Sequence, residues 1–333
     1  MTPVTAANDI LIVASSVAQQ LPAAVGELLS AGLRISQQNG GRVVAALLGD
    51  ATANLADELI ARGADRVHSI AGAELGDDVV EAHLPALLEV CRQAEPQLVL
   101  LTHDLIGAEL APRLAFRLDG AVASGCVDVH FAEGAIHCTR PCYGGIARAV
   151  ETFTRTPVVA TIRAGVFEPA ARRPERQGEI VTFVADSATN PRTHLLERKL
   201  DAVEGVRLED ARVIVAGGRG LDGPEGFRAL EELARALDAA VGASRVPCDL
   251  GWCPHSWQIG LTGKSVTPDL YIAVGISGAG HHMAGCGNAK AIVAINIDPE
   301  AAIFQDARYG VVGDYREIVP ALTAEVRRLK QAS

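Results

Sequence analysis

Short apolar runs alternate with amphipathic stretches through the first 120 residues. The continuous apolar runs at 10–14 and 98–101 are typical of parallel strands buried on both faces. Residues 25–36 instead repeat leucine and isoleucine at three-to-four spacing, which predicts a helix. The same reasoning predicts strands at 43–48 and 66–70 and helices at 53–61, 79–93 and 106–118. This alternation with short connections predicts a doubly wound, mostly parallel sheet in an α/β domain.

The pattern changes between residues 121 and 162, where predicted strands follow one another without long helices. These strands are expected at 127–131, 136–143, 149–154 and 158–162. We expect this strand-rich segment to form an antiparallel or mixed extension of the first sheet.

Residues 168–210 are polar, with Pro169, Pro174 and Pro191 among clustered charged side chains. This composition is typical of a surface crossover and linker, with one further strand expected at 180–185. We therefore expect an N-terminal α/β domain over 1–190, a linker over 191–210 and a second domain over 211–333.

The second domain begins with another buried-strand pattern, at residues 212–216. Gly218, Gly220 and Gly223 follow with the G-x-G-x-x-G spacing, before a helix predicted at 227–237, which is typical of a Rossmann-like dinucleotide fold. Further strands are expected near 241–243 and at 270–274, 291–295 and 309–314, and a last helix at 317–329. Small or polar residues come directly after these strands and would line the ligand edge of a parallel sheet: Gly217, Ser244, Ser277, Asn296 and Asp314.

Two loops around the strand at 270–274 carry the groups best suited to bind a nucleotide. The loop before it contains the polar residues Gln258 and Thr262, and the loop after it, 277–280, consists of small residues followed by two histidines. Backbone N–H groups at the carboxyl end of a buried strand are free to face an anion, and glycine lets them approach it closely. Together, the two loops around the strand at 270–274 predict one bound nucleotide-type cofactor.

Charge and cysteine content narrow the possible partners and compartment. The 40 acidic and 30 basic residues give a net charge of −10, which argues against a nucleic-acid binder that tracks phosphates. The seven cysteines lie at irregular spacings, so we expect no disulfide framework and a reducing compartment. The first residues show neither a signal peptide nor a membrane span, so we expect a cytoplasmic protein without direct membrane insertion.

The histidines and cysteines do not follow a metal-binding pattern. No C-x-x-C pair occurs, so we expect neither a metal site nor an iron–sulfur cluster. His103 stands at the end of the strand predicted at 98–101, where hydrogen bonding to its neighbours is favoured over contact with a ligand.

Several phrases of the second domain occur together in the order of one known family. They are GGRGL at 217–221, GASR at 242–245, QIGLTGK at 258–264, PDLYIAVGISGA at 268–279, VAINIDPEAAIF at 293–304 and YGVVGD at 309–314. In the first domain, LAPRLA at 110–115 and RPCYGG at 140–145 also match family positions. The chain thus resembles the electron transfer flavoprotein alpha subunit.

The resemblance implies FAD bound in the C-terminal domain and an obligate heterodimer with a beta subunit that docks on the N-terminal domain. It implies an electron carrier and not an enzyme, with flavin dehydrogenases as donors and an acceptor such as a membrane quinone oxidoreductase. Two alternatives stay open: a specialised or bifurcating relative that takes electrons from NADH, and an NAD-dependent dehydrogenase.

The resemblance also implies the residues that contact FAD. Arg245 would lie against the isoalloxazine, Thr262 would hydrogen-bond near its N5, and His282 would reach its O2 side. The loop from Ser277 would serve the pyrophosphate, with Asn296 and Asp314 towards the adenosine. The full set of expected contacts is Arg219, Ser244, Arg245, Gln258, Ile259, Gly260, Leu261, Thr262, Ser277, Gly278, Ala279, Gly280, His281, His282, Asn296 and Asp314.

The chain departs from the family pattern at three of these positions. Where the family reads S-G-A-I-Q-H, Gly280 and His281 replace the isoleucine and glutamine, and Leu261 replaces the polar residue before the threonine. A histidine that gains charge near neutral pH would make the flavin potential depend on pH.

Overall fold

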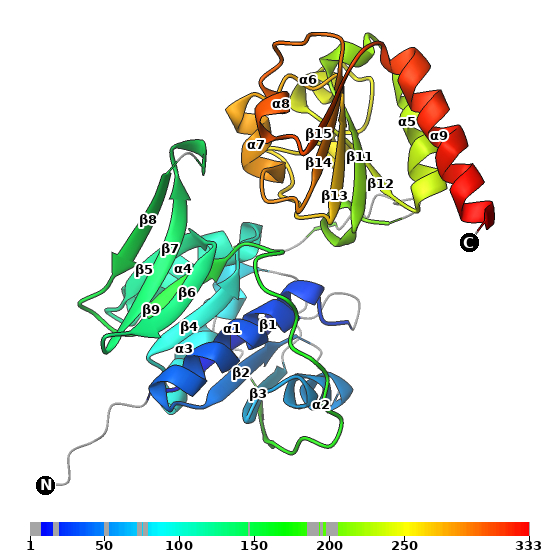
Figure 1. Cartoon of the computed structure of the whole chain (residues 1–333). Coiled ribbons are helices and arrows are strands. Elements are labelled where there is room, and N and C mark those ends of the chain that lie inside the picture. The colour runs from blue at the N-terminus through cyan, green and yellow to red at the C-terminus, as the bar shows by residue number, and fades with distance from the viewer. Residues whose placement is uncertain are drawn as a thin grey trace, which may run out of the picture. The chain divides into compact units, whose positions relative to one another are not determined.

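The computed structural model describes residues 8–15, 20–49, 53–71, 75, 79–145, 147–184, 193, 196–197 and 206–332 (Figure 1). The chain divides into two compact units, the first made of Met1–Cys142 and Ile146–Lys199 and the second of Tyr143–Gly145 and Leu200–Ser333. Most of the expected linker, 191–210, lies outside the described residues, so the expected domain limits stay a prediction. Among the helices described, none combines the length and the apolar character needed to cross a membrane.

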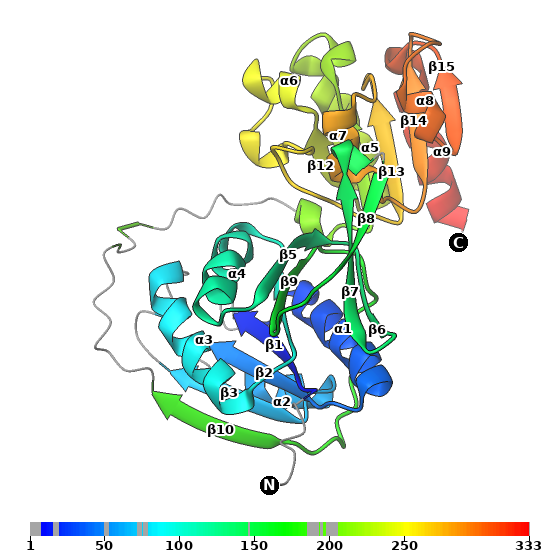
Figure 2. The ribbon, with the colours of Figure 1, turned by 90° about the vertical axis from the view of Figure 1, so that its left-hand side faces the viewer.

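Seven parallel strands form the sheet of the first unit, in the order β10-β3-β2-β1-β4-β9-β5. The predicted apolar runs become its central strands, and the strand expected at 180–185 becomes β10, at the edge beside β3 (Figure 2). The strands are β1 (Ile10–Ser15), β2 (Val43–Leu48), β3 (Arg66–Ala71), β4 (Leu98–Thr102), β5 (Ala121–Cys126), β9 (Val158–Ile162) and β10 (Glu179–Val184).

Helices cover both faces of this sheet, as the predicted doubly wound fold requires. The first two helices bury residues such as Leu28 and Leu59 against one face, and the next two bury Leu87 and Leu110 against the other. These helices are α1 (Ala23–Asn39), α2 (Ala53–Ala61), α3 (Val80–Ala94) and α4 (Leu105–Arg117).

Three strands of the strand-rich segment leave the first sheet. β6 (Asp128–Ala132), β7 (Ala135–Cys142) and β8 (Ala147–Thr152) form a separate antiparallel sheet, whereas β5 and β9 pair in parallel within the first one. The expected antiparallel pairing of these strands is confirmed, whereas their expected place as an extension of the first sheet is wrong. Glu133 and Gly134, both with positive φ, join β6 to β7 in a two-residue turn, and a turn this short connects only antiparallel strands.

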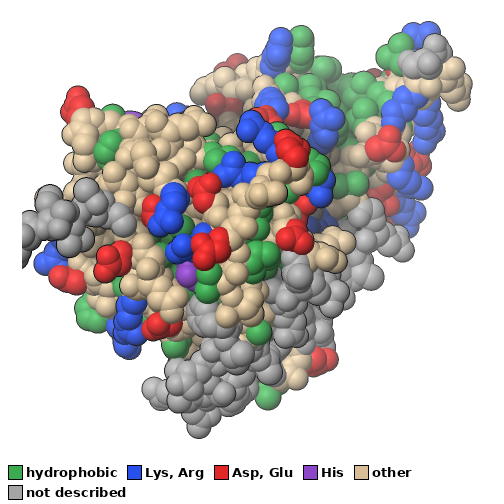
Figure 3. All heavy atoms as spheres, turned by 90° about the horizontal axis from the view of Figure 1, so that it is seen from below, with side chains coloured by type: hydrophobic (Ala, Val, Ile, Leu, Met, Phe, Trp, Pro, Cys, Tyr) green, Lys and Arg blue, Asp and Glu red, His purple; other side chains and the backbone are tan. Residues whose placement is uncertain are grey.

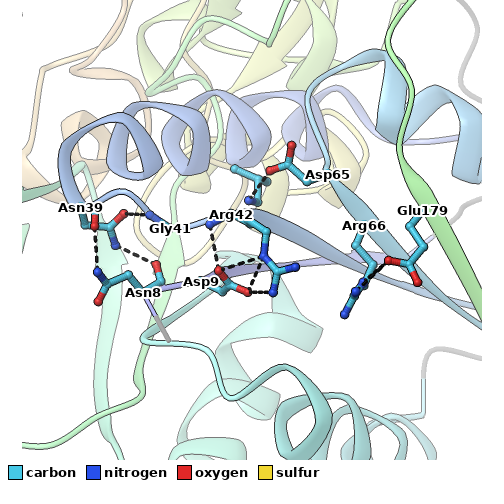
Figure 4. A network of polar contacts seen from close by, with 9 residues as sticks. Asn8, Asp9, Asn39, Gly41, Arg42, Asp65, Arg66 and Glu179 are labelled. Atoms are coloured by element: carbon cyan, nitrogen blue, oxygen red, sulfur yellow. Dashed lines mark hydrogen bonds and ion pairs between the residues drawn. The ribbon is translucent and has the colours of Figure 1, made fainter. Parts of the chain in front are cut away.

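Polar side chains tie together the amino-terminal ends of neighbouring strands in the first sheet (Figure 4). Asp9 accepts hydrogen bonds from the Arg42 backbone N–H at 2.9 Å and from its guanidinium at 2.7 Å. Arg66 pairs with Glu179 at 2.7 Å, between β3 and β10. These contacts stabilise the sheet at the edge opposite to the carboxyl ends of its strands.

Five parallel strands form the sheet of the second unit, in the order β12-β11-β13-β14-β15. This is the predicted Rossmann-like sheet, and each expected strand is present. The strands are β11 (Val213–Gly217), β12 (Ala240–Ala243), β13 (Leu270–Val274), β14 (Ile292–Asn296) and β15 (Tyr309–Val312).

Two long helices and a short one cover one face of the second sheet, and two further short helices lie on the other face. Two long helices lie side by side (Figure 1) and bury residues such as Leu230 and Val319. Cys286 and Ile303, from two short helices, are buried on the opposite face. The helices are α5 (Glu225–Leu237), α6 (Arg245–Asp249), α7 (Gly280–Cys286), α8 (Ile303–Asp306) and α9 (Tyr315–Ala332).

Positive and negative side chains are interspersed on the face shown in Figure 3. Acidic and basic side chains of the first unit also pair: Glu58 contacts Arg62 at 2.7 Å and Arg172 at 2.8 Å. This mixed surface differs from the continuous cationic face with which a protein tracks phosphates.

Candidate cofactor site

The strand order of the second sheet changes direction beside β11. The chain runs from β11 through α5 to β12 on one side and later places β13 on the other side. In open α/β sheets, ligands bind outside the carboxyl ends of the strands at such a switch point. The carboxyl ends that meet here are Gly217 and Val274.

The loops after β11 and β13 touch closely because both are built of glycine. The N–H of Gly218 donates to the Val274 carbonyl at 2.9 Å, and that of Gly220 to the Gly275 carbonyl at 3.0 Å. A Cβ on Gly218 would lie 2.2 Å from the Gly275 carbonyl oxygen. The first two glycines of the G-x-G-x-x-G spacing therefore serve the contact between these loops, whereas Gly223 faces open space.

Two adjoining cavities open at the switch point. The larger has a volume of about 700 Å³ and the smaller of about 150 Å³, and Arg245, His281 and His282 line both. The structure thus brings together most of the residues predicted to hold the cofactor. Those that line one or both cavities are Arg219, Ser244, Arg245, Gln258, Ile259, Gly260, Leu261, Thr262, Ser277, Ala279, His281, His282 and Asn296.

Three predicted contacts, Gly278, Gly280 and Asp314, do not line either cavity. Gly278 has φ +84° and packs against the Ile303 backbone, so it shapes the loop after β13. The Asp314 carboxylate accepts the Arg316 backbone N–H at 2.9 Å, at the start of α9. Contact with FAD stays a prediction for the whole predicted set, and these three residues also lie outside the lining of both cavities.

A closed loop, residues 258–264, forms one wall of the smaller cavity. The Ile259 N–H donates to the Ala243 carbonyl at 2.9 Å, which joins the loop to β12. The Leu261 N–H donates to the His281 carbonyl at 2.7 Å, which joins it to α7. Between these anchors the side chain of Leu261 stays 56% exposed, an apolar surface beside the cavity.

Arg245 supplies a positive charge to both cavities. It begins α6, and its Nε contacts the Asp249 carboxylate, one turn further on, at 3.1 Å. Its side chain is 66% exposed, so the guanidinium keeps room to face a ligand. Arg219, also exposed, adds a second guanidinium to the larger cavity.

Both ring nitrogens of His282 have partners in the protein. The Ile259 carbonyl can only accept, so His282 Nδ1–H donates to it at 3.0 Å, and Nε2 accepts from the Tyr271 hydroxyl at 3.0 Å. Burial lowers the pKa of His282, which keeps the imidazole neutral near pH 7. His281, by contrast, is exposed and lines both cavities.

Asn296 likewise uses its side chain within the protein. Its Nδ2 donates to the Ile276 carbonyl at 2.9 Å and its Oδ1 accepts the Asp298 N–H at 3.0 Å, so it joins the loops after β13 and β14. Sequence reasoning missed six residues that line the larger cavity. Three of them directly follow a strand or a predicted contact: Gly220, Val246 and Gly275. The others lie further along the loops after β13 and β14: Ile276, Asp298 and Ala301.

Other candidates of the sequence analysis have structural partners. His103 Nδ1 lies 2.8 Å from the Thr161 hydroxyl, as expected for a histidine that hydrogen-bonds its neighbours. In the part of the chain that the structure describes, no group of three or more His, Cys, Asp or Glu residues is placed to hold a metal ion. A separate hollow of about 250 Å³, near Cys91 and Pro96, lies at the amino-terminal side of β4, away from the ligand edge.

Comparison with known proteins gives the site its context. Residues 10–188 match the family model "Electron transfer flavoprotein domain", and residues 207–287 match "Electron transfer flavoprotein FAD-binding domain". The electron transfer flavoprotein subunit alpha of Bacillus subtilis is 43% identical over 91% of this chain and 92% of its own length. That of Thermoanaerobacterium thermosaccharolyticum is 39% identical over 91% and 93%, and the FixB protein of Clostridium saccharobutylicum is 35% identical over 92% of both chains.

The chain belongs to the electron transfer flavoprotein alpha subunit family. Its cofactor is FAD, and its function is electron transfer. The match to the FAD-binding domain runs from before β11 to the end of α7. It therefore includes the 258–264 loop and the two elements that anchor this loop, β12 and α7.

The residues of the two cavities fit this flavin. Gly220 and Gly275, which have no side chains, line the larger cavity where the loops after β11 and β13 meet, so they leave backbone exposed to a dinucleotide there. Two guanidiniums provide charge for its phosphates or for a reduced ring. Leu261 and Val246, 56% and 42% exposed, offer apolar surface to a planar ring system.

Proposed function

We propose that this flavoprotein subunit holds the isoalloxazine of FAD at the smaller cavity and the dinucleotide part in the larger one. The observation that carries this proposal is that Arg245 lines both cavities, beside the loop that contains Thr262. Arg245, which lies where the two cavities meet, can then interact with the flavin ring, while the backbone of the glycine loops approaches the phosphates.

The chain's own residues have distinct tasks in this arrangement. Arg245 would stabilise the negative charge that a flavin gains on reduction, which would raise its reduction potential. Thr262 would hold the flavin ring as a hydrogen-bond donor at N5, and the backbone of the loop from Ser277 would hold the pyrophosphate. His282 holds the 258–264 loop against α7 through Ile259. FAD itself supplies the redox chemistry.

The subunit acts as an electron carrier and has no substrate-turnover site of its own. Its partner is an electron transfer flavoprotein beta subunit, which docks on the N-terminal unit in an obligate heterodimer. Flavin dehydrogenases donate the electrons, and a downstream acceptor such as a quinone oxidoreductase receives them. The free cysteines, seven in number, suit the reducing cytoplasm.

Expression with and without the beta subunit tests the pairing. We expect the two chains to co-purify as a stable one-to-one complex, and the alpha chain alone to aggregate or lose FAD. An obligate interface of this kind buries more than about 2,000 Å² in total. A well-behaved monomer that carries tightly bound FAD without the beta subunit would contradict the proposal.

A further inference from the structure

The Gln258 and Thr262 side chains are held on one rigid turn. The Lys264 N–H donates to the Gln258 carbonyl at 2.8 Å, and the Gly263 N–H donates to the Gly260 carbonyl at 3.0 Å. A Cβ at Gly263 would lie 2.4 Å from the Gln258 carbonyl oxygen, so only glycine permits so tight a turn. With the anchors to β12 and α7, these bonds fix the backbone positions of Gln258 and Thr262 relative to each other.

A hydrogen bond between these side chains has a defined direction. Gln258 Nε2 donates to Thr262 Oγ1 at 3.0 Å. The threonine oxygen thus acts as an acceptor toward the amide, and its own O–H proton remains available for another partner. Both residues line the smaller cavity, so that proton can be directed to an acceptor within it.

We propose that Gln258 is a positioning residue that makes Thr262 a hydrogen-bond donor toward flavin N5, rather than a direct contact of FAD. The inference rests on the proposed function, which places N5 beside Thr262. In the oxidised ring N5 has a lone pair and accepts, whereas after reduction and protonation it carries a hydrogen and donates. In the two-electron couple, where N5 gains a hydrogen, a fixed donor at this position would favour the oxidised ring, so Gln258 would lower the two-electron reduction potential of FAD.

The Q258L substitution replaces the amide of Gln258 with an apolar side chain of similar size. It therefore tests directly whether Gln258 fixes Thr262 as a hydrogen-bond donor. In Q258L, Thr262 is free to rotate and accept from the reduced ring. We expect the ratio of reduced to oxidised FAD, at fixed ambient potential, to rise by about twofold to tenfold, the range for one hydrogen bond. A factor of ten corresponds to about 30 mV in a two-electron couple. Dye equilibration of the complex with its beta subunit measures this shift.

The T262V background separates a positioning role from a direct one. Valine keeps the shape of threonine without its hydroxyl, so we expect Q258L to have no further effect on the potential there, whereas T262S should retain the effect. The ¹⁵N chemical shift of FAD labelled at N5 should differ between Q258L and the wild type. It should not differ between T262V and the double variant that carries both substitutions. Q305L, at an exposed glutamine of α8 outside both cavities, is the matched control and should leave the potential unchanged.

Three results would overturn the inference, and they are distinguishable. A shift from Q258L that is equally large in the T262V background would show that Gln258 contacts FAD itself. Loss of FAD uptake in Q258L, but not in T262V, would show the same, because a residue that acts through Thr262 cannot cost more than Thr262. A wild-type complex that takes up no FAD would overturn the proposed function as well.

Discussion

Arg245 is the residue on which the electrostatics of the site depend most. A unit charge about 4 Å away is worth about 1 kcal/mol in water and about 4 kcal/mol in a partly buried setting. Because the side chain is two-thirds exposed and contacts Asp249, the lower end of this range applies. The sequence phrase GASR was enough to predict that Arg245 belongs to the site. Its contact with Asp249 could be recognised only in the structure.

R245M should lower the reduction potential of bound FAD, since it removes the charge that stabilises the reduced ring. Loss of about 1 kcal/mol corresponds to about 40 mV per electron. R245K, which keeps the charge, should retain most of the wild-type value. Redox titration of the complex measures both, and an unchanged potential in R245M would contradict the role of Arg245.

His282 should make the folded state sensitive to acid. Burial lowers its pKa in the folded protein below the ordinary value of about 6.5, so below that pH the unfolded chain binds more protons than the folded one. The free energy of unfolding therefore falls as the pH drops through this value. H282Q should make the fall shallower, though not abolish it, because burial also lowers the pKa of His68 and His103.

Urea denaturation at about pH 7.5 and at about pH 5.5 provides this comparison. Glutamine can still donate to the Ile259 carbonyl and accept from Tyr271, so H282Q keeps the local hydrogen bonds. An equally steep pH dependence in H282Q and wild type would rule out His282 as a source of the acid sensitivity.

At the scale of elements, the contact between the loops after β11 and β13 shapes the site. G218A places a Cβ 2.2 Å from a backbone oxygen that cannot move aside easily. We expect it to lower the free energy of unfolding by about 1–3 kcal/mol, as overpacking does, and to weaken FAD binding at least tenfold. Calorimetry and FAD titration of the complex measure the two effects.

G280A is the matched control for this substitution. A Cβ at Gly280 meets nothing within 4 Å, and the residue begins helix α7. Alanine there should change the stability by no more than about 0.5 kcal/mol. If G218A were as mild as G280A, the close approach of the two loops would not be what forms the site.

Element positions followed from the sequence wherever the apolar pattern alone decides them. The strands at 10–14 and 270–274 were predictable because each apolar run is too short for a buried helix and matches a strand buried on both faces. Strand partners in the 121–162 segment were not, because alternation identifies a strand but not the sheet that it joins. The engaged ring nitrogens of His282 were also beyond the sequence, since they depend on Tyr271 and Ile259, which the fold brings together.

At the level of the whole molecule, electron transfer by this protein requires FAD held by the second unit. The measurement that tests this most directly is the flavin content and visible absorbance of the purified complex with its beta subunit. We predict a yellow complex with one FAD held by each alpha chain, and a second flavin per complex would indicate the bifurcating branch of the family. A complex that is colourless, and stays so after incubation with excess FAD, would contradict the account.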